Sequence, residues 1–140
     1  TDRPVILSHT TPTMFPDTSL EAQDLAGGKL PRPRLELPRD RERLEAVAEN
    51  GGVVGLIHLA HRNLDSVVRD IETALDVVGP DHGCLGSDQY GIELPPEGLE
   101  DIAKVPRLTD ALSARAQSDD VIIQFLGANY LRVFEEVWGE

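Results

Sequence analysis

The chain has 140 residues, which is the size of one domain. Hydrophobic residues make up 40% and charged residues 27%, a balance typical of a globular protein and not of a disordered or collagen-like one. The 25 acidic and 13 basic residues give a net charge of −12, which repels nucleic acids and anionic lipid surfaces. No apolar run approaches the roughly 20 residues that cross a bilayer, so no membrane-spanning segment is expected.

The single cysteine, Cys84, excludes an internal disulfide and fits a reducing compartment. The first residues lead directly into a strand-like segment, without the charged and apolar regions of a signal peptide. From the single cysteine alone, a cytoplasmic location is expected.

The N-terminal third predicts one strand and one long loop. Residues 4–8 form a short apolar run rich in β-branched side chains, typical of a strand buried in a parallel sheet. Residues 10–38 carry prolines and glycines that interrupt every helix or strand pattern. Loops longer than about 12–15 residues are often functional, which favours a role for this one.

The middle of the chain alternates between helix and strand. Asp40 is the expected cap of a helix over 41–50, followed by a buried strand over 52–57. Apolar residues at helical spacing then predict a helix from about residue 67, which Gly79 and Pro80 end. A third strand over 83–87 follows.

The C-terminal part, 97–138, is expected to be helical, with helices near 99–105, 108–116 and 119–137. Gly127 is placed where it could divide the last of these in two. Strands that alternate with helices imply βαβ units, and therefore a parallel sheet within a single α/β unit.

Polar side chains follow the expected strands at their carboxyl ends, where active sites form in parallel α/β proteins. His9 follows the first strand, His58 the second and Asp88 the third. A histidine at a strand end is more often structural than a ligand, and that interpretation is favoured for His58. Small polar neighbours make His9 the better ligand candidate. For Asp88 a turn-forming role and a catalytic role have comparable weight.

Other candidates lie in the loops. His61 follows His58 by three residues but lacks the glutamate of a helical metalloprotease motif, so it is interpreted as loop surface. The arginines Arg32, Arg34 and Arg39 could bind a carboxylate with their planar guanidinium groups, although loop arginines are more often simply solvated.

Five segments in order along the chain carry a resemblance to a known family: PVILSHT at 4–10, AENGGVVG at 48–55, GSDQYGI at 86–92, GLED at 98–101 with Pro106, and GANYLRVF at 127–134. Together they resemble the renal (membrane) dipeptidase family of zinc peptidases. The resemblance implies a (β/α)8 barrel with two zinc ions that hydrolyses dipeptides, often with a D-residue at the C-terminal position.

The resemblance also assigns roles to individual residues. His9 resembles the zinc-ligand histidine at the end of the sixth barrel strand. Asp88 resembles the active-site aspartate of the eighth strand, which contacts the substrate amine and the water between the metals. Arg34 is the first choice for the arginine that binds the substrate carboxylate, with Arg32 or Arg39 next. Tyr90 stands where the family often has a second aspartate.

The family's remaining metal ligands would all precede Thr1. The expected fold is therefore the C-terminal portion, about three βα units, of a (β/α)8 TIM-type metallo-hydrolase barrel, completed by an N-terminal half in the same or another chain. The resemblance also allows a homodimer.

Two functions follow from these observations. In the first, the chain supplies the last strands of a zinc-dependent dipeptidase that cleaves peptide bonds with a metal-activated water, and is inactive as the isolated 140 residues. In the second, it is a non-catalytic α/β binding or interaction module without a complete metal site.

Overall fold

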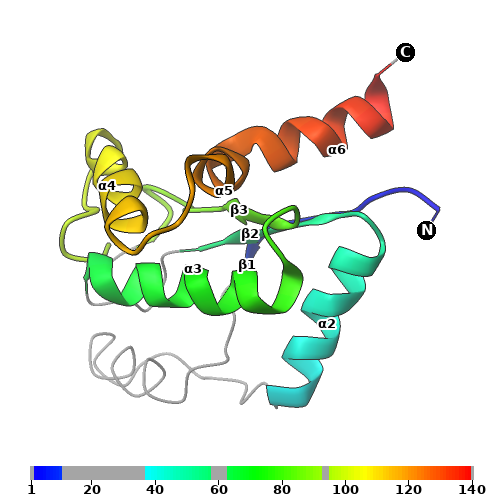
Figure 1. The fold of residues 1–140 in the computed structure, drawn as a ribbon, viewed down its shortest axis with the longest axis horizontal. Coiled ribbons are helices and arrows are strands. Elements are labelled where there is room, and N and C mark those ends of the chain that lie inside the picture. The colour runs from blue at the N-terminus through cyan, green and yellow to red at the C-terminus, as the bar shows by residue number, and fades with distance from the viewer. Residues whose placement is uncertain (1, 11–36, 58–62, 93–94, 140) are drawn as a thin grey trace.

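A computed structural model describes residues 2–10, 37–57, 63–92 and 95–139, with the side chains of 37–40 outside the description. Its centre is a three-stranded parallel sheet in the order β1-β2-β3, formed by β1 (Ile6–Thr10), β2 (Val53–Leu56) and β3 (Gly83–Leu85). The expected parallel sheet is therefore confirmed (Figure 1).

Two helices connect the strands and lie on the same side of the sheet: α2 (Leu37–Glu49) and α3 (Leu64–Val78). In α3, Asn63 and Ser66 form a reciprocal capping box, which satisfies amide groups that the first helical turn leaves unpaired. The amide of Gly79 bonds the Leu75 carbonyl at the other end of α3. The capping box fixes the start of α3 at Leu64, and the bond from Gly79 explains why the helix ends where the sequence indicated.

The C-terminal part is helical, as expected. After a short 3-10 helix, η1 (Ile102–Lys104), come α4 (Pro106–Ala114), α5 (Asp119–Ile123), a π-helical turn η2 (Gln124–Ala128) and α6 (Asn129–Trp138). The backbone kinks at Gly127 inside η2, so the predicted division of the last helix is confirmed.

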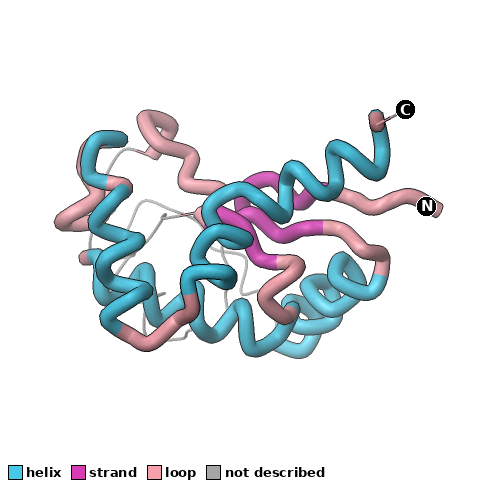
Figure 2. Tube along the Cα trace, turned by 45° about the horizontal axis from the view of Figure 1, so that its top comes forward, coloured by secondary structure: helices cyan, strands magenta, loops and turns pink. Residues whose placement is uncertain are grey.

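The two faces of the sheet are covered by different helices (Figures 1 and 2). Val54 and Leu56 of β2 belong to a large apolar cluster with side chains of α2, α3 and α4. Val53, from the same strand, packs with Cys84 and with Val133 of α6. Because successive strand residues point to opposite faces, α6 covers the face opposite α2 and α3.

Several expected boundaries differ from the structure. The helix expected over 41–50 begins at Leu37, so Asp40 lies inside its first turn and does not cap it. The first strand, expected over 4–8, spans Ile6–Thr10. The loop expected over 10–38 therefore loses Thr10 to β1 and residues 37 and 38 to α2, and the residues between them, 11–36, lie outside the described residues. A proline is compatible with a first helical turn because the amide it lacks has no partner there.

Two further boundaries were predicted too long. The helix expected over 99–105 is a single 3-10 turn, η1, in which the Asp101 carboxylate accepts from the Ala103 amide. The third strand ends at Leu85, two residues earlier than expected. Beyond it the backbone leaves the sheet toward Asp88.

Candidate functional site

The carboxyl ends of the strands bring the two principal site candidates to one edge of the sheet. His9 lies within β1, one residue before its end, and Asp88 follows the last residue of β3 by three positions. Both pairings are parallel, so these ends share an edge, with β2 between them. Both side chains are exposed.

A β-bulge interrupts β1 at the candidate ligand. Leu7 pairs with Val54 and Thr10 with Leu56, so that Ser8 and His9 together oppose one residue of β2. A bulge places an extra residue on one strand and turns its side chains from their regular directions. The direction of the His9 side chain therefore depends on this local irregularity.

Two glycines accommodate the backbone of the bulge. A Cβ atom at Gly55 would overlap the Ser8 carbonyl oxygen and the Tyr130 hydroxyl, and one at Gly86 would overlap the same carbonyl oxygen. The Ser8 carbonyl thus lies over the sheet face at Gly55 and Gly86, where other residues would place a side chain. The Tyr130 hydroxyl donates to it at 3.1 Å.

The imidazole of His9 has a polar neighbour, since its Nδ1 atom lies 2.9 Å from the Ser8 hydroxyl oxygen. A hydrogen bond at Nδ1 leaves the other ring nitrogen, Nε2, for a ligand. His9 is therefore suited to bind a metal through Nε2.

Asp88 adopts an unusual backbone conformation. Its φ angle is +50°, a left-handed region in which aspartate is enriched among residues other than glycine. Its carbonyl accepts from the Gly91 amide at 2.9 Å, and its carboxylate lies directly over the Gly91 Cα, where a Cβ would meet Oδ1 at 2.5 Å. The turn holds the exposed carboxylate at the strand exit, so its turn-forming role leaves the carboxylate accessible, and its catalytic role stays a prediction.

The donor types fit zinc, which binds imidazole nitrogen and carboxylate oxygen. Among the residues that the structure describes, no three histidine, cysteine, aspartate or glutamate side chains gather closely enough to hold a metal ion. The described part of the chain therefore offers donors of the right kind, but fewer than the three protein ligands of a catalytic zinc site.

The remaining candidates are not brought to this edge by anything the structure describes. His58, His61, Arg32 and Arg34 lie outside the described residues. For Arg39 the backbone is part of α2, while its side chain is outside the description. Their expected roles stay predictions.

Arg43 is a cation near the site that the sequence analysis did not single out. Its Nη2 atom lies 3.4 Å from the hydroxyl of Thr10, the residue after His9. A crossover helix runs back against its strands, so the first half of α2 lies near their carboxyl ends. The basic charge of 29–43 was visible in the sequence, but which cation reaches β1 depends on where α2 begins.

The sheet face beneath α6 carries two groups with displaced pKa values. Burial raises the pKa of the Cys84 thiol to about 12, and burial also raises the pKa of Tyr130 to about 12. The thiol is therefore protonated at neutral pH and unsuited to nucleophilic or metal-ligand roles. Tyr130 likewise keeps its proton at neutral pH and can donate a hydrogen bond.

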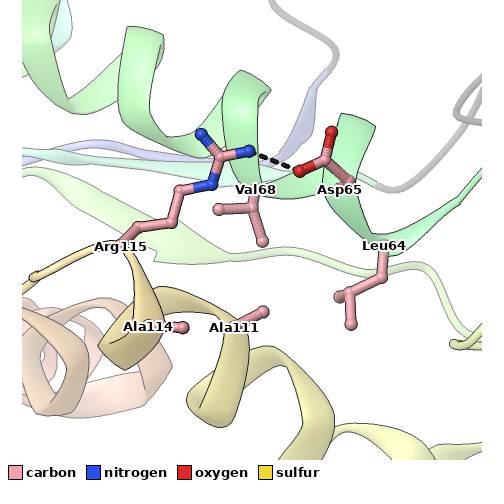
Figure 3. A pocket seen from close by; sticks show the side chains of 6 residues that line it. All are labelled: Leu64, Asp65, Val68, Ala111, Ala114 and Arg115. Atoms are coloured by element: carbon pink, nitrogen blue, oxygen red, sulfur yellow. Dashed lines mark hydrogen bonds and ion pairs between the residues drawn. The ribbon is translucent and has the colours of Figure 1, made fainter.

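A groove of about 480 Å³ lies away from these residues, between α3 and α4 (Figure 3). Arg115 forms an ion pair with Asp65 across it and lies 3.4 Å from Glu72. Of the predicted site residues that the structure describes, none lines this groove.

Comparisons with known proteins identify relatives along most of the chain. Residues 33–138 match the family described as Membrane dipeptidase (Peptidase family M19). Dipeptidase verJ of Clonostachys rogersoniana is 32% identical over 96% of this chain and 32% of its own length. An uncharacterized dipeptidase of Schizosaccharomyces pombe is 34% identical over 94% of this chain and 35% of its own.

Solved structures show the same fold. A metallopeptidase from Rhodobacter sphaeroides, bound to a phosphinate mimic of the dipeptide L-Ala-D-Ala, is 25% identical with a TM-score of 0.64, over 70% of this chain and 31% of its own. An amidohydrolase from Pseudomonas aeruginosa superposes on 99% of this chain and 47% of its own, with a TM-score of 0.72 and 24% identity. The chain thus spans about a third of the length of the dipeptidase relatives.

Proposed function

Because the chain belongs to the membrane dipeptidase family, peptidase family M19, we propose that it supplies the last strands of the active site of a zinc-dependent dipeptidase. The observation that carries the proposal is the placement of His9 and Asp88 at the carboxyl edge of one parallel sheet, His9 within β1 and Asp88 three residues after β3. That edge is where (β/α)8 enzymes bind substrate and metal.

The proposed architecture is the last three strands of a (β/α)8 barrel. Within the described residues the sheet has three strands, so the outer edges of β1 and β3 are open to further pairing. Both crossover helices lie on one side, as in a barrel. Further parallel strands, supplied by an N-terminal half in the same or another chain, would pair with these edges and close the barrel.

In this site His9 would hold one of two zinc ions, with the other ligands outside the chain. Zinc, when bound, supplies Lewis acidity that activates water and polarises the peptide carbonyl. The contact between His9 Nδ1 and the Ser8 hydroxyl would orient the ring for that role.

Asp88 would orient the water and the substrate amine, and act as general acid and base. Its carboxylate would take the proton that water loses as the new C–O bond forms. It would then give that proton to the leaving nitrogen as the C–N bond breaks. The left-handed turn at Asp88 and its contact with Gly91 support this role, because they fix the carboxylate at the strand exit.

The proposed substrate is a dipeptide, whose free carboxylate would need a cation in an otherwise acidic protein. Arg34, Arg32 and Arg39 are the proposed candidates for that contact. The dipeptide mimic bound to the Rhodobacter sphaeroides relative supports this substrate class. A homodimer and a cytoplasmic location remain part of the proposal. In the described residues, no helix is long and apolar enough to cross a membrane.

The test is dipeptide hydrolysis by the protein expressed from its own gene in its natural host, with zinc supplied and Ala-Ala and Ala-D-Ala as substrates. The Asp88→Asn variant should lose about 10²–10⁴-fold in kcat, the usual contribution of a general acid or base. Asp76→Asn, on the exposed side of α3, is the matched control and should keep full activity. Unchanged kcat in the Asp88 variant would overturn its role.

Zinc content tests the ligand assignment separately. His9→Ala should lower bound zinc, whereas His82→Ala should not, because His82 bonds the Gly52 carbonyl at the other end of the sheet. The non-catalytic module is the less favoured alternative, since named relatives are dipeptidases. A wild-type protein that binds no zinc and cleaves neither dipeptide would support that module.

A further inference from the structure

We propose that Tyr130 is a positioning residue, whose hydroxyl holds the Ser8 carbonyl over the sheet and so sets the backbone from which His9 projects. The hydrogen bond joins α6 to β1 across 122 positions of the sequence, at 3.1 Å. Only one part of the inference rests on the proposed function, namely that the direction of the His9 side chain matters for zinc binding.

The first step of the argument is the register of β1. The Val53 amide donates to the Val5 carbonyl before the bulge, and the Ile57 amide donates to the Thr10 carbonyl after it. The acceptors are five residues apart on β1, while the donors are four apart on β2. One residue of β1 is therefore additional, and the strand must depart from its regular path between these two bonds.

The second step is the direction in which the backbone of β1 departs from its regular path. The Ser8 carbonyl lies over the sheet face at Gly55 and Gly86, where a Cβ atom on either residue would overlap its oxygen. Ser8 is exposed, and water at an exposed carbonyl would not hold it in one direction, whereas a donor on a packed helix does. The Tyr130 hydroxyl is the donor that the structure provides.

The third step is that α6 can hold this hydroxyl in place. The side chain of Asn129 donates to the carbonyls of Pro80 and Gly83, at 2.7 and 2.9 Å. Arg132 donates to the carbonyls of Gly51 and Asp81, both at 2.9 Å. These bonds fix the residues on either side of Tyr130 to the amino ends of β2 and β3. The tyrosine can then extend along the sheet toward the bulge.

The arrangement connects the two ends of the sheet. Asn129 and Arg132 contact the amino ends of the strands, while His9 lies near the carboxyl end. Tyr130 spans the distance and contacts the residue immediately before the histidine. The hydroxyl touches neither substrate nor metal in this account. It acts through the backbone of Ser8.

Amide hydrogen exchange of the protein expressed from its own gene, in the absence of added zinc, tests the contact independently of activity. In Tyr130→Phe, which removes only the hydroxyl, exchange at the Ile57 amide should accelerate about three- to tenfold more than exchange at the Val53 amide, which reports the change in global stability. Thr73→Val is the matched control, because the Thr73 hydroxyl also donates to a backbone carbonyl, that of Arg69 in α3. It should leave both amides unchanged.

The difference between the two amides separates positioning from general stability. A purely structural role for Tyr130 would accelerate exchange at Val53 and Ile57 alike, and that result would overturn the proposal. Unchanged exchange at both amides would overturn it as well. Val53 also reports that the variant is folded, since its side chain is fully buried.

Zinc affinity gives the functional readout. In the protein expressed from its own gene, Tyr130→Phe should weaken the binding of Zn²⁺ alone by about 10- to 100-fold, as loss of an outer-shell partner typically does. Thr73→Val should bind zinc as the wild type does. If exchange at Ile57 accelerates but zinc affinity is unchanged, Tyr130 does not position His9. A wild-type protein without zinc affinity would instead contradict the proposed function, and the exchange result would still decide the contact.

Discussion

The two faces of the sheet are packed by different kinds of contact. On the face covered by α2, α3 and α4, the side chains are large and apolar, and Val54 and Leu56 are almost completely buried among them. On the face covered by α6, two positions are glycines, a carbonyl lies over the sheet, and a tyrosine hydroxyl bonds it. The first face stabilises the fold by apolar burial, whereas the second contacts the backbone next to His9.

Under the proposed function, this difference separates residues that stabilise the fold from residues that would direct His9. Apolar packing tolerates gradual change because neighbouring side chains can adjust, at a cost that grows with the cavity left behind. The arrangement at Gly55 and Gly86 involves backbone atoms, which cannot rotate away. Substitutions on the two faces should therefore differ in kind as well as in size.

The largest expected effect is on the apolar face. Phe125 is fully buried in the main cluster, and Phe125→Ala should lower the free energy of unfolding by about 3–5 kcal/mol, because it removes apolar contacts and leaves a cavity. Urea unfolding followed by circular dichroism measures this. A loss below about 1 kcal/mol would show that the cluster is loosely packed.

The next effect is on the glycine-containing face. Gly55→Ala places a methyl group onto the Ser8 carbonyl and the Tyr130 hydroxyl and should cost about 1–3 kcal/mol of unfolding free energy, the usual range for overpacking. Gly127→Ala is the control, because no atom lies within 4 Å of the added methyl group. Equal stability of the wild type and the Gly55 variant would contradict the close approach.

Removing only the hydroxyl should have a smaller effect on stability. Tyr130→Phe should lower the free energy of unfolding by about 0.5–1.5 kcal/mol, the net value of one hydrogen bond. The rings of Tyr130 and Phe134, with centroids 6.3 Å apart, keep their contact in this variant. A loss as large as that of Gly55→Ala would indicate that the ring and not the hydroxyl changed its position.

The last effect is absent at neutral pH and appears only in alkali, as a pH dependence of stability that arises on the α6 face. Burial raises the pKa of Cys84 from 9.0 to about 12, and that of Tyr130 from 10.0 to about 12. Above pH about 9 the unfolded chain loses these protons first, so the folded chain binds more protons and stability falls as pH rises toward about 12. Cys84→Ala should reduce this alkaline decline, measured from urea midpoints relative to the midpoint at neutral pH. A decline as steep as in the wild type would contradict the assignment.

The sequence predicts the apolar face well and the α6 face poorly, for a physical reason. Periodic apolar residues indicate which side of a helix is buried, so α3 and the parallel sheet follow from the pattern. Tyr130 fits the apolar pattern of the helix expected over 119–137, and nothing in its spacing indicates that its hydroxyl bonds the Ser8 carbonyl. That contact depends on a bulge, and a bulge has no periodic signature.

The site divides in the same way. Active sites form at the carboxyl ends of parallel strands, and this rule selects His9, His58 and Asp88 as candidates from the order of strands and polar residues. The roles of His9 and Asp88 come from the family resemblance. The left-handed turn at Asp88 and the proximity of Arg43 to Thr10 depend on where β3 and α2 begin and end. Such boundaries are decided by tertiary contacts more than by local preference.

Native mass spectrometry of the protein purified from its natural host tests the central claim most directly, because one spectrum reports chain length, companions and bound metal. The account predicts a species heavier than the 15.3 kDa chain, either a longer polypeptide or a complex with an N-terminal companion, that carries two zinc ions. A 15.3 kDa species without zinc would contradict it.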